Sequence, residues 1–245
     1  MRGLDMADGL GVEIRVVKIG TCTLDPGNVM SALHVHLRQQ LGVGGGSSVT
    51  VLRDGEDGWL LVDTGFEREG DLSVANQRAN ARSLRAHLEL AGVRPKQVSK
   101  VFVTHFHRDH TGGLEQFRDA TWYAHRLALD KYWGPDKGRF VPLDDGDEVV
   151  PRATVIPTPG HTLGHCSILW TSEHKAVRVA ISGDAIVNLA WLQSGRIWQF
   201  NRDLHSVEST QSSIALLLGL SDIVIPGHGE PFFTTTALEL ARQRE

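Results

Sequence analysis

Residues 104–113, THFHRDHTGG, constrain the fold of this chain more than any other segment, because they join a dense polar cluster to the end of an apolar run. Three histidines and one aspartate lie within six residues, directly after VSKVFV. Buried imidazoles and carboxylates are costly unless they are paired or bind a cation. In an extended segment alternate side chains point the same way, so His105 and His107 can face one metal ion, while Asp109 and His110, further round the loop, can face a second. The segment therefore predicts a site for two metal ions on a strand-to-helix loop.

Short β-branched runs alternate with longer amphipathic stretches along the rest of the chain. GEDG between two such runs indicates a hairpin, which excludes a purely parallel sheet. No low-complexity linker or short repeat interrupts the order, so we expect one domain over residues 1–245, with two mixed sheets and helices outside them. The expected strands are residues 12–20, 47–54, 59–65, 98–105, 120–125, 153–161, 166–170, 176–184 and 221–231, the expected helices are 73–93 and 206–220, and a further helix should start within 111–117.

Each of the two longer helices carries an apolar stripe at helical spacing, which predicts the face that packs on a sheet. Gly92 stands where the first helix should stop. The stripes consist of Ala81, Leu84, Leu88 and Ala91 in the first helix and of Val207, Ile214 and Leu218 in the second.

Three other predicted strands end in residues that could complete a metal site. PTPGH ends in His161, ISGD ends in Asp184, and IPGHG contains His228. A structural turn explains each of these motifs adequately when it is taken alone. Five histidines and two aspartates at strand ends are harder to assign to packing. Imidazoles and carboxylates suit Zn²⁺, and also Fe or Mn, whereas the lack of a cysteine pair argues against a structural zinc site.

The motifs HFHRDH, TPGHTLGH, SGD and PGHG occur in the order found in the metallo-β-lactamase-fold hydrolases, and the chain resembles that family over about residues 49–231. The resemblance implies an αββα sandwich of two mixed β-sheets flanked by helices, with the site at one edge between the sheets. It implies a first metal held by His105, His107 and His161, a second held by Asp109, His110 and His228, and Asp184 as the bridge between them.

Two features refine this resemblance. GRFVPLDDGDEV and PGHGEPF are similar to segments of the proteins called metallo-β-lactamase domain-containing protein 1, whose family implies nuclease or orphan-hydrolase roles. A carboxylate at position 184 is common in the lactonase, glyoxalase II and nuclease branches and is not a feature of true zinc β-lactamases. We therefore do not expect antibiotic hydrolysis as the native reaction.

Two divalent ions a few ångström apart lower the pKa of a shared water to about 7, so the expected nucleophile is a metal-bridging hydroxide. Asp109 is the candidate to orient this water and to carry its proton to the leaving group. Asp63, at the end of a strand in VDTG, is the candidate carboxylate that fixes the outer nitrogen of a ligand histidine. Capping of the turn before Gly65 is an equally open role for Asp63.

The substrate residues are less constrained by the sequence. Trp191 and Trp198 could form an apolar wall over the metals, an oligomer contact or part of the core. Arg139 could bind a phosphate or carboxylate, or lie on a solvated face. We expect a binuclear metal-dependent hydrolase that acts on a small ester, lactone or thioester. The alternatives are a phosphodiesterase or nuclease of the same fold, and a metal-binding or di-iron redox module that is not a hydrolase.

Composition limits the partners. Twenty-five Lys and Arg against 29 Asp and Glu give a net charge of −4, which offers no broad attraction to nucleic acid or to anionic membranes. Cys22 and Cys166 form no disulfide framework and suit a reducing compartment, so we expect a cytoplasmic protein. No signal peptide or membrane-length apolar run is present, and a homodimer is the protein assembly that we consider.

Overall fold

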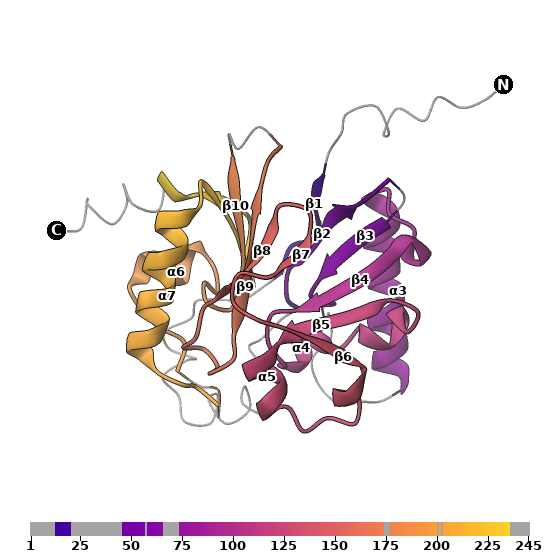
Figure 1. Ribbon diagram of the computed structural model, residues 1–245, viewed down its shortest axis with the longest axis horizontal. Helices are drawn as coiled ribbons and strands as arrows, with labels where there is room; N and C mark the ends of the chain where they lie inside the picture. The colour runs from indigo at the N-terminus through magenta and orange to yellow at the C-terminus, as the bar shows by residue number, and fades with distance from the viewer. Residues whose placement is uncertain are drawn as a thin grey trace.

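The computed structural model describes residues 13–20, 46–56, 58–65, 74–173, 177–199, 201 and 203–235. Within these residues two six-stranded sheets face each other and helices cover their outer sides, as Figure 1 shows. The predicted sandwich of two mixed sheets is therefore confirmed. Cys22 lies outside the described residues. Within the described part of the chain, no helix has both the length and the apolar character that crossing a bilayer requires.

The first sheet is mixed because its first three strands form antiparallel pairs, whereas the last four run parallel to one another. The hairpin predicted around GEDG is confirmed as the second and third of these strands. In spatial order the strands are β1 (Ile14–Lys18), β2 (Val49–Asp54), β3 (Gly58–Val62), β4 (Val98–Val103), β5 (Thr121–His125) and β6 (Phe140–Leu143).

The second sheet is also mixed. Its one parallel pair among the described strands joins β10 to β11, and the remaining neighbours are antiparallel. In spatial order the strands are β12 (Phe232–Phe233), β11 (Ile223–Pro226), β10 (Arg178–Gly183), β9 (Cys166–Thr171), β8 (Ala153–Pro157) and β7 (Glu148–Val150).

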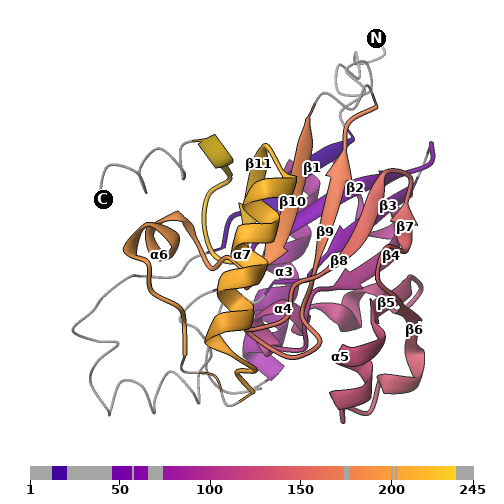
Figure 2. The same cartoon turned by 60° about the vertical axis from the view of Figure 1, so that its left-hand side comes forward.

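The helices lie outside the two sheets. Helix α3 covers the outer face of the first sheet, and α6 and α7 lie on the outer side of the second, where Figure 2 shows α7 in front of β10. Short helices occupy the connections. The bounds are α3 (Val74–Leu90), η1 (Pro95–Gln97), α4 (Arg108–Thr111), η2 (Leu114–Phe117), α5 (Arg126–Lys131), η3 (Lys137–Arg139), α6 (Leu189–Ser194) and α7 (Val207–Leu220).

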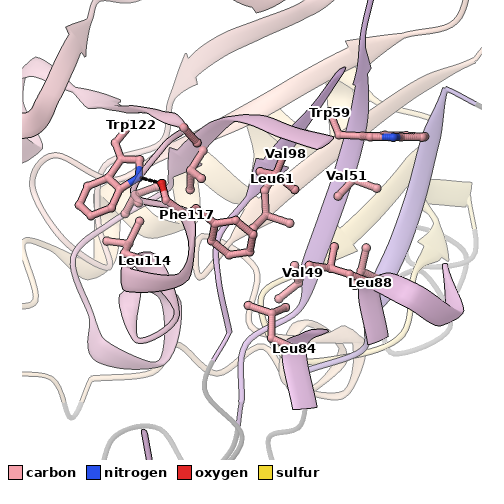
Figure 3. Packing of buried hydrophobic residues seen from close by; sticks show 14 of the residues in the cluster. Val49, Val51, Trp59, Leu61, Leu84, Leu88, Val98, Leu114, Phe117 and Trp122 are labelled. Carbon is pink, nitrogen blue, oxygen red and sulfur yellow. Dashed lines mark hydrogen bonds between the residues drawn. The ribbon is translucent and has the colours of Figure 1, made fainter. Parts of the chain in front are cut away.

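The central strands are rich in apolar residues because most of their positions are buried on both faces of the sheet. On β4, Val101 and Val103 point into the core beneath α3, while Phe102 points into the core between the sheets. Figure 3 shows the first of these cores, in which Leu84 and Leu88 of α3 lie close to Val49 of β2. A rigid strand packed on both sides therefore delivers the histidine motif at a fixed place.

The predicted stripe of α3 is confirmed at Leu84 and Leu88, and the predicted stop at Gly92 is confirmed by its left-handed backbone, with φ +71°. A helix does start within 111–117, but it is the short 3₁₀ helix η2, at Leu114. An α-helix that was not predicted, α4, starts before this range, at Arg108. Asp109 and His110 are thus held in helical backbone and not in an extended loop.

The predicted stripe of α7 is displaced by about one position. Its most buried residues are Thr210, Ser213 and Leu217, whereas the predicted residues are half-buried. The two hydroxyls can be buried because each donates a hydrogen bond: Thr210 Oγ1 to the carbonyl of Ser206 at 2.8 Å, and Ser213 Oγ to that of Pro159 at 2.7 Å. Hydroxyl groups whose hydrogen bonds are satisfied in this way can face the interior of the protein.

Cys166 lies on β9 in the core between the sheets, and burial raises the pKa of its thiol, with the charge of Asp145 acting in the same direction. At pH 8 the thiolate fraction should therefore fall far below that of an unfolded chain, where the thiol pKa is about 8.5. In a Cys22→Ser variant we expect iodoacetamide to label almost none of the native protein, and one site per chain in urea. Equal labelling rates in the two states would contradict the buried placement.

Candidate metal centre

Four side chains from three separate segments converge on one point. The first ligand group consists of His105, His107, His161 and Asp184, whose ligating atoms lie within 4.8 Å of one another. His107 Nδ1 is 3.0 Å from His105 Nε2 and 3.0 Å from His161 Nε2. The first two residues follow β4, His161 follows β8, and Asp184 follows β10. The structure thus brings together residues far apart in the sequence.

The second ligand group lies beside the first and consists of Asp109, His110 and His228. Asp109 Oδ2 lies 3.3 Å from His228 Nε2 and 3.9 Å from His110 Nε2. Asp109 and His110 belong to α4, and His228 follows β11. All three side chains are buried, so each needs a partner of opposite polarity.

Asp184 faces both groups with different oxygens. Its Oδ2 lies 3.3 Å from His161 Nε2, whereas its Oδ1 lies 3.2 Å from both His110 Nε2 and His228 Nε2. The sequence PGHG makes this approach feasible, because a Cβ on Gly227 would lie 2.1 Å from Asp184 Oδ1. A carboxylate in this position can bridge two cations.

These residues fit a pair of metal ions. A tetrahedral shell with bonds of about 2.0–2.1 Å to nitrogen and oxygen has ligand edges of about 3.3–3.4 Å, close to the separations of 3.0–3.3 Å found here. Several buried ligand atoms also make no hydrogen bond among the described residues, which is rare for a buried polar atom without a further partner. They are Asp109 Oδ2, His110 Nε2, both carboxylate oxygens of Asp184, and His228 Nε2.

The histidines of the two ligand groups differ in the direction of their pKa shifts. Burial lowers the pKa of His161 to about 4 and holds the pKa of His105 well below its usual value, so both rings are neutral and able to ligate. Burial also acts to lower the pKa of His110, but three carboxylates, Asp184 foremost, outweigh it and raise that pKa to about 10. Negative charge is therefore concentrated around the second group, where cations would replace bound protons.

Asp63 supports the second group. Its Oδ2 lies 2.7 Å from His110 Nδ1 and accepts a hydrogen bond from Thr104 Oγ1 at 2.8 Å, and its Oδ1 accepts one from the Thr104 amide at 2.9 Å. It also has left-handed backbone, with φ +56°, just before the turn at Gly65. Both roles considered for Asp63 are thus compatible with its position.

The sequence alone did not predict that Asp203 and Asn201 contact the ligand histidines. Asp203 Oδ1 lies 2.9 Å from Nε2 of His107, and Asn201 Nδ2 donates to the carbonyl of His161 at 2.6 Å. Asp203 lies 96 residues from His107 and Asn201 lies 40 residues from His161, both in an irregular segment. No periodicity or motif in NRD marks them, so only the tertiary structure could place them here.

Trp191 and Trp198 are both buried and meet edge to face, with ring centroids 5.6 Å apart. They line a narrow cavity together with His161 and Asp184 of the first ligand group. The structure does not bring Arg139 to either ligand group or to this cavity. Its guanidinium lies 4.0 Å from the centre of the Trp122 ring and donates to the carbonyl of Arg118 at 2.7 Å, which holds it against the first sheet.

Comparison with known proteins agrees with this geometry. The family model of the metallo-beta-lactamase superfamily matches residues 42–228. A hydroxyacylglutathione hydrolase of Pseudomonas putida is 35% identical over 135 residues, which is 52% of this chain and 46% of that protein. Metallo-beta-lactamase domain-containing protein 1 of Xenopus laevis is 32% identical over 168 residues, 66% of each chain. The chain thus spans about half the length of the first relative.

Solved structures share the fold. A quorum-quenching N-acyl homoserine lactone lactonase superposes with a TM-score of 0.61 at 22% identity, covering 88% of this chain and 91% of that one. A putative metallo-beta-lactamase from Thermotoga maritima gives a TM-score of 0.60 at 22% identity, covering 90% and 98%. With its family match, its two facing sheets and its two ligand groups, the chain belongs to the metallo-beta-lactamase superfamily.

Proposed function

We propose that this protein is a two-metal hydrolase, with zinc as the metal, that acts on a small ester, lactone or thioester. The observation that carries the proposal is the position of Asp184, whose two oxygens face two separate groups of ligands. Two divalent ions bound there would activate a water molecule at neutral pH and polarise the oxygen of a substrate carbonyl. The remaining tasks, proton transfer and substrate binding, belong to side chains of the protein.

Asp109 is assigned the proton transfer. Its carboxylate belongs to the second ligand group, beside the place where a metal-bound water would lie, so it can orient that water and accept its proton. The Ser47 hydroxyl donates to the Asp109 carbonyl at 2.8 Å and fixes the backbone at this residue. From this position the carboxyl group can return the proton to the leaving oxygen or sulfur.

The cavity beside the first ligand group supports an acyl substrate. Its described lining is mainly apolar, with Trp191, Trp198 and several aliphatic residues, and Arg196 is the single cationic residue within it. A phosphodiester would gain from more positive charge. The name of the hydroxyacylglutathione hydrolases also favours carbonyl chemistry, although the chain covers only about half of those relatives.

A substrate panel tests the proposal. Zinc-loaded protein should hydrolyse small esters, lactones or thioesters, with rates that depend only mildly on salt, because a net charge of −4 provides no steering of anions. Efficient, salt-sensitive cleavage of bis-phosphodiesters or single-stranded RNA, without turnover of any carbonyl substrate, would favour the nuclease alternative. Binding of iron with oxidase activity and no hydrolysis would favour the redox alternative.

Trp191 should limit the size of the substrate group that enters the cavity, whose volume of about 20 Å³ holds roughly one water molecule. Replacing Trp191 with leucine should open this space. We expect the ratio of kcat/KM for a hexanoyl ester to that for an acetyl ester to rise by about 10-fold or more, the order of effect of an added methylene in an apolar pocket. Steady-state kinetics with both esters measures it.

Trp133→Leu is the matched control, because that side chain is 92% exposed and lies outside the cavity. It should leave the ratio unchanged. An unchanged ratio in Trp191→Leu, with the protein folded and both ions bound, would show that the acyl group lies elsewhere.

A further inference from the structure

The segment between α6 and α7 holds two members of the first ligand group. Besides the bonds from Asp203 to His107 and from Asn201 to His161, the backbone amides of His205 and Ser206 donate to the carbonyl of Gly160, at 2.9 and 3.2 Å. Gly160 directly precedes His161 and has φ +142°, a backbone that favours glycine. One short segment therefore fixes the side chain of one ligand and the backbone of another.

His107 is the ligand that most needs such support. Its side chain is 22% exposed, whereas those of His105 and His161 are 1% and 2% exposed, so packing restrains its ring least. Its Nδ1 faces the other two histidines, and its Nε2 faces Asp203. A carboxylate that accepts from Nε2–H fixes both the tautomer and the orientation of an imidazole, which leaves Nδ1 as the ligating atom.

We propose that Asp203 is a positioning residue for the first ligand group and that Asn201 holds it in place, through a hydrogen bond from Asn201 Nδ2 to Asp203 Oδ1 at 3.1 Å. Each group then has its own supporting carboxylate, because Asp63 serves the second group through His110. The two supports differ in environment: the Asp63 side chain is 4% exposed and that of Asp203 is 59% exposed.

This difference has a consequence for metal binding. A hydrogen bond at the surface competes with water, whereas one in the interior does not. The ion in the first group should therefore be the more easily exchanged of the two. Its affinity should depend directly on Asp203, whereas Asp63 reaches this group only through the Thr104 hydroxyl, which lies 3.1 Å from His105 Nδ1. The inference rests on the two-ion site proposed above and is independent of the substrate.

The test measures zinc affinity site by site, by competition of zinc-loaded protein with a chromophoric chelator. Asp203→Ala should weaken the binding of one of the two zinc ions by about 10- to 100-fold, as expected for loss of a hydrogen bond to a ligand histidine. The affinity of the other site should not change. Asp203→Asn should be intermediate, because its amide oxygen still accepts a hydrogen bond. Asp119→Ala removes an exposed carboxylate elsewhere and should change neither ion.

A second readout separates positioning from general destabilisation. In ¹⁵N-labelled, zinc-loaded protein, the Nε2–H proton of His107 should be slow to exchange with solvent in the parent and fast in Asp203→Ala. Circular dichroism should show the same fold in both proteins, since Asp203 is largely exposed.

Parental affinity at both sites in Asp203→Ala, or equal weakening of both sites, would overturn the inference and leave the proposed function standing. Failure of the parent itself to bind zinc would overturn both.

Discussion

Asp184→Ala is expected to remove both metal ions and to lower kcat/KM by about 10³-fold or more, because this one side chain faces both ligand groups. The loss should be larger for Asp184 than for a residue of one group, such as His105 or His228, whose replacement by alanine leaves the other group complete. Kinetics on the best substrate of the panel and elemental analysis of the same sample measure the two effects together.

Asp222→Ala provides the control for Asp184→Ala. Asp222 directly precedes β11 of the second sheet. It forms a surface ion pair with Arg178 and lies outside both ligand groups. It should retain both ions and parental activity. If Asp184→Ala kept two ions, or if it kept its rate after losing them, the bridging role of Asp184 would be wrong.

Asp63→Ala should produce the largest loss of stability among the site variants. The substitution leaves His110 Nδ1 and both donors of Thr104 buried without their acceptor. Removing one partner of a buried ionic pair costs about 3–5 kcal/mol of unfolding free energy. Urea denaturation of the metal-free protein measures this cost without the contribution of bound ions.

Asp54→Ala is the matched control for Asp63→Ala in the first sheet. Asp54 bonds to Lys100 and Ser99 near the surface, where loss of an ion pair costs about 1 kcal/mol or less. Asp63→Asn should fall between the two, because the amide keeps one acceptor and tolerates left-handed backbone. A cost for Asp63→Ala no larger than that for Asp54→Ala would show that Asp63 only shapes its turn.

Much of the fold could be predicted because the central strands are buried on both faces. Short runs rich in β-branched and aromatic residues, such as VSKVFV, indicate strands such as β4, and the hairpin of β2 and β3 is marked by its turn. Several short elements, β6, β7, β12, α5 and α6, were not predicted, since their two to six residues show no clear period. The predicted stripe of α7 was misplaced because the polar residues Thr210 and Ser213 are buried, with their hydroxyls donating to the carbonyls of Ser206 and Pro159.

The candidate site also contains residues that could be predicted from the sequence and residues that could not. The seven predicted ligands stand in compact motifs at strand ends, so their convergence follows from the order of the strands. Asp203 carries no such mark, because its role depends on how an irregular segment returns over His107. Arg139 was placed by its charge alone, whereas the Trp122 ring and the carbonyl of Arg118 hold it elsewhere. The motifs identify the residues that the structure gathers into two groups, whereas supporting and substrate residues depend on tertiary packing.

The most direct test of the two-metal site is elemental analysis of the purified, zinc-supplemented protein after removal of loosely bound ions. Because the ligands form two groups that share Asp184, we predict close to two zinc ions per chain. Absence of bound transition metal after such supplementation, in protein that is folded by circular dichroism, would contradict the metal-dependent mechanism.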